Sequence, residues 1–130
     1  MYKIEKKNYG YKLIFDANIN LPEMSDWVED ARKNLVDAKN EFGVFVDMRG
    51  LRPLSIDSQS KMQEGQILFK EKGMIRSVVI VASATIKMQF QRIAKETGIY
   101  EWERYIDSSS SKDWEEIGIN WISKGIDPDK

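Results

Sequence analysis

The sequence of 130 residues contains neither cysteine nor histidine. The absence of cysteine excludes disulfides, thiolate metal sites and cysteine nucleophiles. The absence of histidine removes the commonest general base and transition-metal ligand, and with it a serine triad of the usual kind. Catalysis would have to use lysine, tyrosine or carboxylate side chains, and no dense carboxylate loop predicts a Mg²⁺ or Ca²⁺ site. We therefore expect a protein that is not an enzyme and has no cofactor.

Long apolar runs and an excess of one sign of charge are also missing. No apolar run approaches the roughly 20 residues of a membrane span, and Met1 to Lys7 lacks the apolar core of a signal peptide. The expected location is the cytoplasm. The 20 Lys and Arg residues nearly balance the 21 Asp and Glu residues, which gives a formal net charge of -1. A nucleic-acid binder normally shows a basic stripe, so nucleic acid is not an expected partner.

The strands are predicted from two kinds of pattern. Residues 2–7 and 11–19 alternate between apolar and polar on either side of the turn Asn8-Tyr9-Gly10, which predicts a β-hairpin. The short apolar runs 42–48 and 75–82 predict strands that are buried on both faces. A helix lies between them, so they should be parallel neighbours with a right-handed crossover. Residues 49–53 are expected to form a loop, and residues 101–107 a further short strand.

Four helices are predicted from apolar residues at helical spacing. The first follows an N-cap at Asn20 and extends to residue 38; the second covers residues 56–72. The third is capped by Ser83 or Thr85 and ends at Gly98, and the fourth covers residues 114–122 after a cap at Ser110. The order is β-β-α-β-α-β-α-β-α. This predicts an α/β fold, a central mixed and mostly parallel sheet packed by four helices, in a single domain of residues 1–124 with a frayed tail of residues 125–130.

Four stretches together resemble the STAS domains, the sulfate-transporter and anti-sigma-factor antagonist modules. They are the strand 42–51 with its Asp-x-x-Gly ending, the helix start Ile56-Asp57-Ser58, the strand 77–82 and the last helix 114–122. The likeness covers residues 2–123 and is greatest to bacterial stand-alone domains similar to stage II sporulation protein AA, which are grouped with SEC14-type domains. It implies a STAS-like module that binds a protein partner in bacterial signalling or regulation. The alternative it implies is a carrier or sensor of a small apolar or lipid-like ligand.

The resemblance also indicates one modification site. Antagonists of this family are phosphorylated on a serine that follows an aspartate at the start of the helix after the central strand, and the matching pair here is Asp57 and Ser58. The sequence departs from the family pattern at Gln59-Ser60, where the antagonists have Ser-Gly, and in the extra Arg52-Pro53 of the preceding loop. Ser58 is therefore a candidate phospho-acceptor, and the alternative is a polar residue in an ordinary first turn.

A binding surface is predicted at the carboxyl ends of the strands, where open α/β sheets place their ligands. Two helix N-termini and several cations converge there, which favours an anion or a partner protein; two ordinary capped helices with solvated cations are the alternative. Met88 lies off its apolar stripe and Trp102 lies in a charged segment, so both are candidate exposed apolar contacts, or else they pack under a neighbouring helix. Trp102 or an apolar edge strand could also support a homodimer. The candidate surface residues are Arg49, Arg52, Asp57, Ser58, Lys61, Ser83, Thr85 and Lys87.

Overall fold

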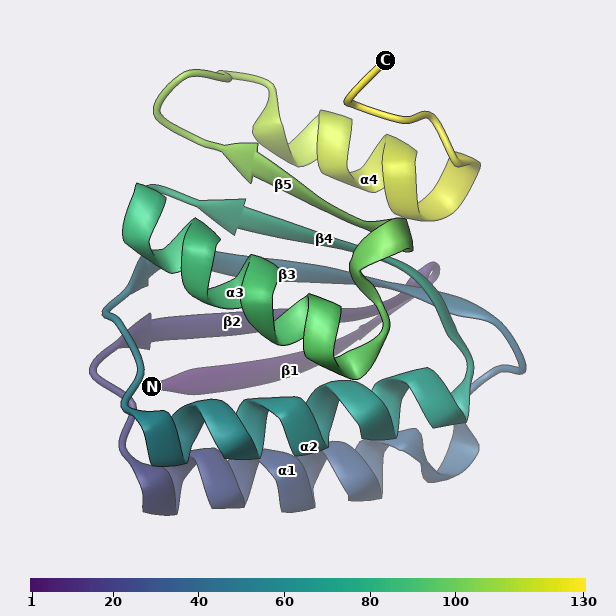
Figure 1. Cartoon of the computed structure of the whole chain (residues 1–130). Helices are drawn as coiled ribbons and strands as arrows, with labels where there is room; N and C mark the ends of the chain where they lie inside the picture. The colour runs from purple at the N-terminus through teal and green to yellow at the C-terminus, as the bar shows by residue number, and fades with distance from the viewer.

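The computed structural model describes all 130 residues and contains one sheet in the order β1-β2-β3-β4-β5 (Figure 1). β1 and β2 form an antiparallel hairpin, and β2 to β5 run parallel to one another. The predicted α/β class, the hairpin and the parallel neighbouring strands are confirmed. The strands are β1 (Tyr2–Lys7), β2 (Gly10–Ala17), β3 (Phe42–Leu51), β4 (Met74–Val81) and β5 (Glu103–Asp107).

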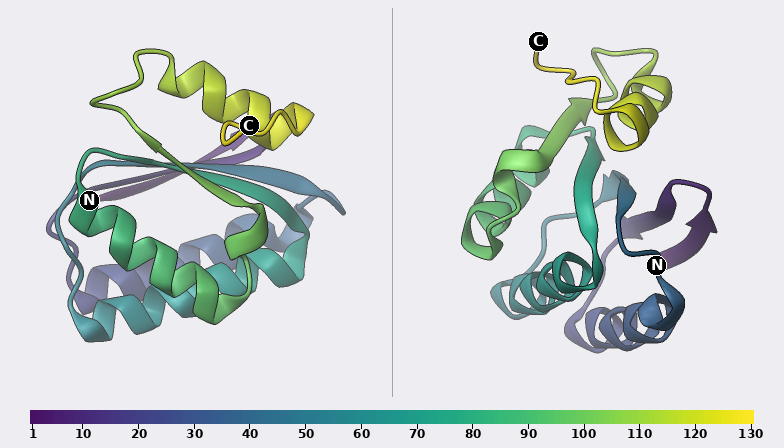
Figure 2. Two further views of the ribbon diagram at one scale, coloured as in Figure 1. Left: turned by 45° about the horizontal axis from the view of Figure 1, so that its top comes forward. Right: turned by 90° about the vertical axis from the view of Figure 1, so that its right-hand side faces the viewer.

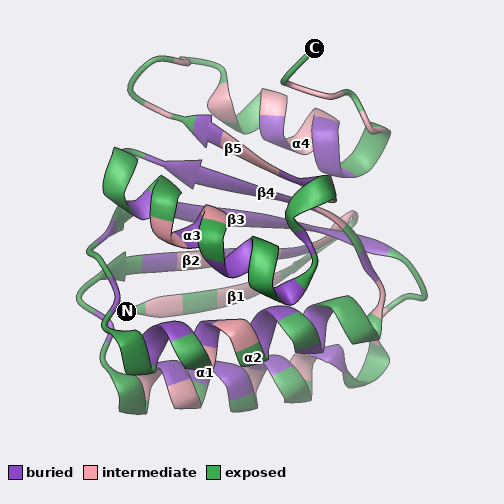
Figure 3. Ribbon diagram, viewed as in Figure 1, coloured by how far each residue is buried: buried purple, intermediate pink, exposed green.

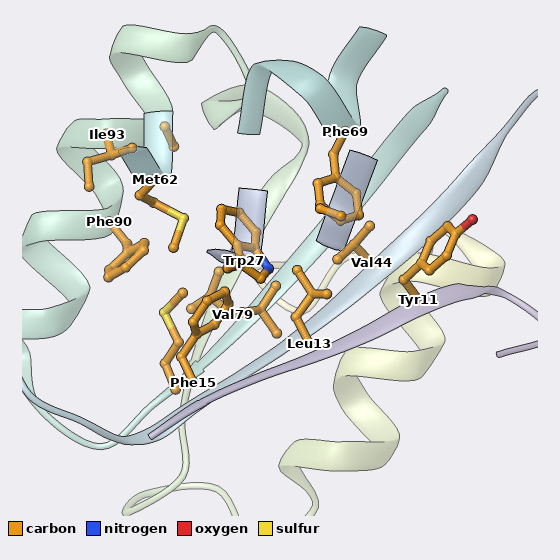
Figure 4. Close-up of a cluster of buried hydrophobic side chains, with 14 of the residues drawn as sticks. Tyr11, Leu13, Phe15, Trp27, Val44, Met62, Phe69, Val79, Phe90 and Ile93 are labelled. Atoms are coloured by element: carbon orange, nitrogen blue, oxygen red, sulfur yellow. The ribbon is translucent and has the colours of Figure 1, made fainter. Parts of the chain in front are cut away.

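The helices cover the two faces of the sheet unequally (Figure 2). α1 (Leu21–Asn34), α2 (Ile56–Lys72) and α3 (Ala84–Thr97) pack on one face, and α4 (Trp114–Lys124) packs alone on the other. The three-helix side contains an apolar cluster of 26 buried residues, part of which is drawn in Figure 4, whereas the α4 side contains a cluster of only 6. Helices on both faces explain why β3 and β4 read as continuous apolar runs.

Side-chain caps fix where three of the helices begin. Asn20 Oδ1 accepts a hydrogen bond from the Glu23 amide at 3.0 Å, and Ser83 Oγ accepts one from the Ile86 amide at 3.1 Å. Ser55 caps α2 in the same way. The predicted cap at Ser110 is wrong, because α4 begins after Asp113, whose side chain makes no capping hydrogen bond.

Three predicted boundaries are also wrong. β3 continues through residues 49–51, which were expected to be a loop, because the end of β2 pairs with Gly50 and Leu51 beyond a bulge. The first helix ends at Asn34, and Leu35–Asp37 forms a 3₁₀ turn. β5 begins only at Glu103, because Tyr100–Trp102 forms a second 3₁₀ turn.

Residues 125–130 follow α4 without forming a helix or strand. The Asp127 carboxylate in this segment is bonded to the Arg104 guanidinium of β5 through two hydrogen bonds, of 2.9 and 3.0 Å. The single domain and the frayed tail stay predictions, although this contact attaches the middle of the tail to the sheet. No helix combines the length and the apolar character that a membrane crossing requires.

Candidate functional site

The carboxyl end of the parallel strands brings together the beginnings of α1, α2 and α3, on the left of Figure 1. Figure 3 shows these helix ends to be largely exposed. A hollow of about 370 Å³ lies between the loop before α1 and the loop before α2. Open α/β sheets use this edge for binding because the connecting loops there present side chains from several strands. The hollow is lined by Asn18, Ile19, Asn20, Leu21, Pro53 and Ser55.

Three apolar side chains on this edge are exposed to solvent. Ile56 in the first turn of α2 is 80% exposed, Met88 of α3 is 69% exposed and Leu21 of α1 is 38% exposed. The Gln89 amide group bonds to the backbone N–H and C=O of Leu54, at 3.0 and 3.2 Å, which ties α3 to the segment that leads into α2. The helix starts are therefore held as one surface. We call it the carboxyl-edge surface and define it by Leu21, Arg52, Pro53, Ile56, Lys87 and Met88.

The polar residues predicted for this edge are only partly available for binding. Arg52 and Lys87 are exposed and form no ion pair, whereas Lys61 is paired with Glu64 at 3.0 Å. The hydroxyl of Ser83 is already used as a helix cap. Asp57 and Thr85 are exposed. The surface thus combines apolar side chains with two free cations, and a specific anion site stays a prediction.

Arg49 is held on the opposite face of the sheet. Its Nε and Nη2 atoms bond to the two carboxylate oxygens of Asp47 at 3.0 and 2.9 Å, and its guanidinium lies 4.1 Å from the centre of the Trp114 ring. Burial raises the pKa of Asp47, but the hydrogen bonds and charge of Arg49 outweigh it and hold that pKa below its usual value. The predicted grouping of Arg49 with the other cations is wrong, because this residue fixes the end of β3 against α4.

Ser58 has no exposed surface. Its hydroxyl lies 3.5 Å from the carbonyl oxygen of Ile19 and 3.2 Å from Ser55 Oγ, between α2 and the loop before α1. A kinase needs the acceptor oxygen to be accessible, and a phosphate carrying about two negative charges has no room in this contact. The prediction of an accessible phospho-acceptor at Ser58 is therefore wrong for this conformation. The helix start points Ile56 and Asp57 outward and Ser58 inward.

Trp102 is half-buried and packs against both apolar clusters, so it does not form an exposed contact. Its backbone carbonyl accepts a hydrogen bond from the Trp121 indole at 3.3 Å, and that indole is also 3.0 Å from the Ser77 carbonyl. These contacts agree with the alternative interpretation, in which Trp102 packs beneath a neighbouring helix. The same contact connects α4 with β4 and with the turn before β5.

A small cavity lies inside the larger core, between the sheet and the helices. It has a volume of about 30 Å³ and is lined mainly by apolar side chains, among them Leu13, Phe15 and Phe90 (Figure 4). The Trp27 indole, which also lines it, has a buried Nε1 atom without a hydrogen-bond acceptor. Since one water molecule needs roughly 10–15 Å³ of such space, the cavity is of the size of two or three water molecules.

Glu103 also lines this cavity, and the sequence did not predict its role. Its carboxylate is fully buried, at 2.5 Å from the Ser77 hydroxyl and 2.6 Å from the Tyr105 hydroxyl, and both can donate to it. Burial raises its pKa from 4.5 to about 7, against the lowering effect of the two hydrogen bonds. The only signal in the sequence was a glutamate that follows Trp102 at a strand start, and this pattern describes a solvated position equally well. No group of three or more carboxylates is placed to hold a metal ion.

Comparisons with known proteins give a likeness of structure but not of sequence. No family model and no curated protein sequence matches the chain. A solved structure of an uncharacterized protein of the DUF3478 family from Shewanella loihica, described as having a SpoIIAA-like fold, matches with a TM-score of 0.57. The two share 17% sequence identity, and the match covers 88% of this chain and 91% of that one. At this identity the match establishes the fold, so this chain has the SpoIIAA-like, STAS-like fold.

Proposed function

We propose that this protein is a non-catalytic binding module that uses the carboxyl-edge surface to bind a partner protein in bacterial signalling or regulation. The observation that supports it most is the exposure of Ile56 and Met88, at 80% and 69%, at the edge of the sheet that also carries a hollow of about 370 Å³ lined in part by Leu21. Exposed apolar side chains that lie among polar residues on one surface are typical of a protein interface. The STAS-like fold supports a binding role by analogy alone.

The chemistry of the surface suggests what the partner presents. A partner side chain of apolar or aromatic character would fill the hollow between Leu21 and Pro53. Arg52 and Lys87, which form no ion pair in this structure, would face acidic residues at the rim. We therefore expect a partner segment with one anchoring apolar residue and acidic neighbours.

The alternative function, a carrier of a small apolar ligand, is supported by the orphaned Nε1 atom of Trp27 in an apolar cavity. The small volume of this cavity is the reason why ligand carriage is the second proposal and not the first. The cavity measures about 30 Å³, whereas an engineered apolar cavity that binds benzene measures on the order of 150 Å³. Ligand binding would need α2 and α3 to move away from the sheet, whereas the carboxyl-edge surface is open as it stands.

The test uses charge substitutions on the surface. The native chain, Ile56→Glu and Met88→Glu are each immobilised, and the proteins retained from an extract of the source cells are compared by quantitative mass spectrometry. We expect at least one protein whose recovery falls by about tenfold or more for both variants, because a buried charge removes an apolar anchor from the interface. Circular dichroism and thermal unfolding show that the variants remain folded, as expected at exposed positions.

Ile67→Glu is the matched control. Ile67 is also an exposed isoleucine of α2, 42% exposed, but it lies more than two turns further along the helix. It should retain the same proteins as the native chain. Equal loss with Ile67→Glu would indicate a general effect of charge, and unchanged recovery with Ile56→Glu and Met88→Glu would refute the proposed surface.

A further inference from the structure

The outer edge of β5 is a second unpartnered feature, separate from the carboxyl-edge surface. β5 is the last strand of the sheet and pairs only with β4. The Ser108 amide donates to the Val81 carbonyl at 2.9 Å, so alternate residues of β5 turn their backbone groups toward β4. The residues between them, including Tyr105, turn theirs outward. An edge of this kind can accept another extended strand.

A groove of about 280 Å³ runs beside this edge, between β5 and the first half of α3. A groove with an edge strand on one side and a helix on the other is the geometry in which protein domains bind extended peptides: the strand supplies backbone hydrogen bonds and the helix supplies side-chain contacts. Figure 2 shows β5 at the margin of the sheet. The groove is lined by Lys87, Gln91, Tyr100, Glu101, Glu103, Arg104, Tyr105 and Asp129.

The tail of the chain contacts one residue of the groove lining, Arg104. Arg104 Nε and Nη2 donate hydrogen bonds to the two carboxylate oxygens of Asp127 at 2.9 and 3.0 Å, and an Asp129 carboxylate oxygen lies 3.5 Å from the same Nε. The hydrogen bonds and charge of Arg104 lower the pKa of Asp127 to about 2. Two acidic residues separated by Pro128 therefore contact a single guanidinium.

The position of Arg104 is also held by contacts that do not involve the tail. Its Nη1 atom donates to the backbone carbonyls of Glu101 and Glu103 at 2.8 and 3.1 Å, and its guanidinium lies 4.3 Å from the centre of the Trp121 ring. An arginine whose fork is held in this way offers its Nε and Nη2 atoms as donors to a carboxylate without a further loss of side-chain freedom. The arrangement is a preformed carboxylate receptor.

We propose that the groove between β5 and α3 binds an extended acidic peptide segment of a partner protein, and that residues 126–130 of this chain occupy the receptor at Arg104 until that segment displaces them. The partner's carboxylate takes the place of Asp127, and its backbone pairs with the free edge at Tyr105. Lys87, exposed at the other end of the groove, favours a second acidic residue, while Glu101 opposes acidic residues next to it. The groove shares only Lys87 with the carboxyl-edge surface, and either proposal can fail without the other.

The experiment uses the tail sequence itself as the probe. An acetylated peptide with the sequence of residues 125–130, Gly-Ile-Asp-Pro-Asp-Lys, is titrated into ¹⁵N-labelled full-length chain and into the full-length double variant D127N/D129N. A tethered tail competes at an effective concentration in the millimolar range. We therefore expect the peptide to bind the double variant at least about tenfold more tightly than the native chain, with chemical-shift changes at Gln91, Tyr100 and Tyr105.

Two controls complete the test. A peptide with asparagine in place of both aspartates should bind neither protein, and R104K in the D127N/D129N background should lose binding, because lysine keeps the charge but not the bidentate fork. Equal affinity of the peptide for the native chain and the double variant would overturn the competition by the tail. Shift changes confined to other surfaces, or no binding to the double variant at millimolar peptide, would overturn the groove as a peptide site.

Discussion

At the scale of single residues, Glu103 gives the clearest dependence on pH. Burial raises its pKa from 4.5 to about 7 in the folded chain, so between these values the folded state holds a proton that the unfolded state has lost. Folding stability therefore falls as the pH rises through this window, by roughly 3 kcal/mol for this group. We expect Glu103→Gln to remove this part of the pH dependence, as measured by urea unfolding between pH 5 and pH 8.

Glu101→Gln is the matched control for this measurement, because Glu101 is an exposed carboxylate two residues away. It should leave the pH profile of the native chain unchanged. The ion-paired carboxylates of Asp47 and Asp127 have pKa values below the usual range, so they lose their charge at lower pH and do not obscure the window. A Glu103→Gln chain with the native slope from pH 5 to pH 8 would show that Glu103 does not titrate there.

At the scale of secondary-structure elements, the contact between α1 and α2 depends on a glycine in the middle of α2. A Cβ atom built on Gly65 would lie 2.0 Å from Cζ3 of Trp27, much closer than atoms can approach. Trp27 is only 1% exposed, and it is held by the rings of Phe15 and Phe69, with centroids 5.1 and 6.1 Å away. The indole therefore has little freedom to move aside.

We expect Gly65→Ala to destabilise the chain, although alanine is the better helix former by about 1 kcal/mol. Overpacking of a tight core costs about 1–3 kcal/mol, and most of this range exceeds the gain. Thermal or urea unfolding should show a net loss of stability of up to about 2 kcal/mol. Ser60→Ala, at an exposed position of α2, should change stability by less than about 0.5 kcal/mol. Stabilisation by Gly65→Ala would mean that the α1–α2 contact is looser than described.

At the scale of the whole molecule, the sequence predicted the elements better than it predicted the surface they form. The alternation of apolar and polar residues in residues 2–15 and the apolar runs of β3 and β4 reflect which side chains are buried, and the sequence shows such patterns directly. The helix caps at Asn20 and Ser83 bond to backbone amides three residues further along the chain, so these helix starts could also be predicted from local sequence. The extension of β3 to Leu51 depends on pairing with β2, which no local pattern contains.

The candidate site, too, could be predicted from the sequence only in part. The edge of the sheet that carries the carboxyl-edge surface follows from topology, so the general location could be predicted. The sequence could not predict which side chains of the first turn of α2 point outward. The apolar Ile56 is exposed and the polar Ser58 is buried, which is the reverse of what their polarities suggest. The pairing of Arg104 with Asp127 joins residues 23 positions apart, and only the folded chain brings them together. Functional contacts of this kind require the three-dimensional arrangement.

The unequal covering of the sheet leads to a prediction about local stability. The side packed by α1, α2 and α3 has a cluster of 26 buried residues, whereas α4 is held by a cluster of 6 and begins without a side-chain cap. Less buried apolar area per helix means a lower free energy of local opening. We expect hydrogen exchange under native conditions to show amides of α4 exchanging through local opening, before those of α2.

The buried part of α4 contributes Trp121 and Ile122, so Ile122→Val should accelerate exchange in α4 while leaving α2 protection nearly unchanged. Exchange of α4 only through global unfolding, with the same free energy as α2, would show instead that the two faces of the sheet form one cooperative unit.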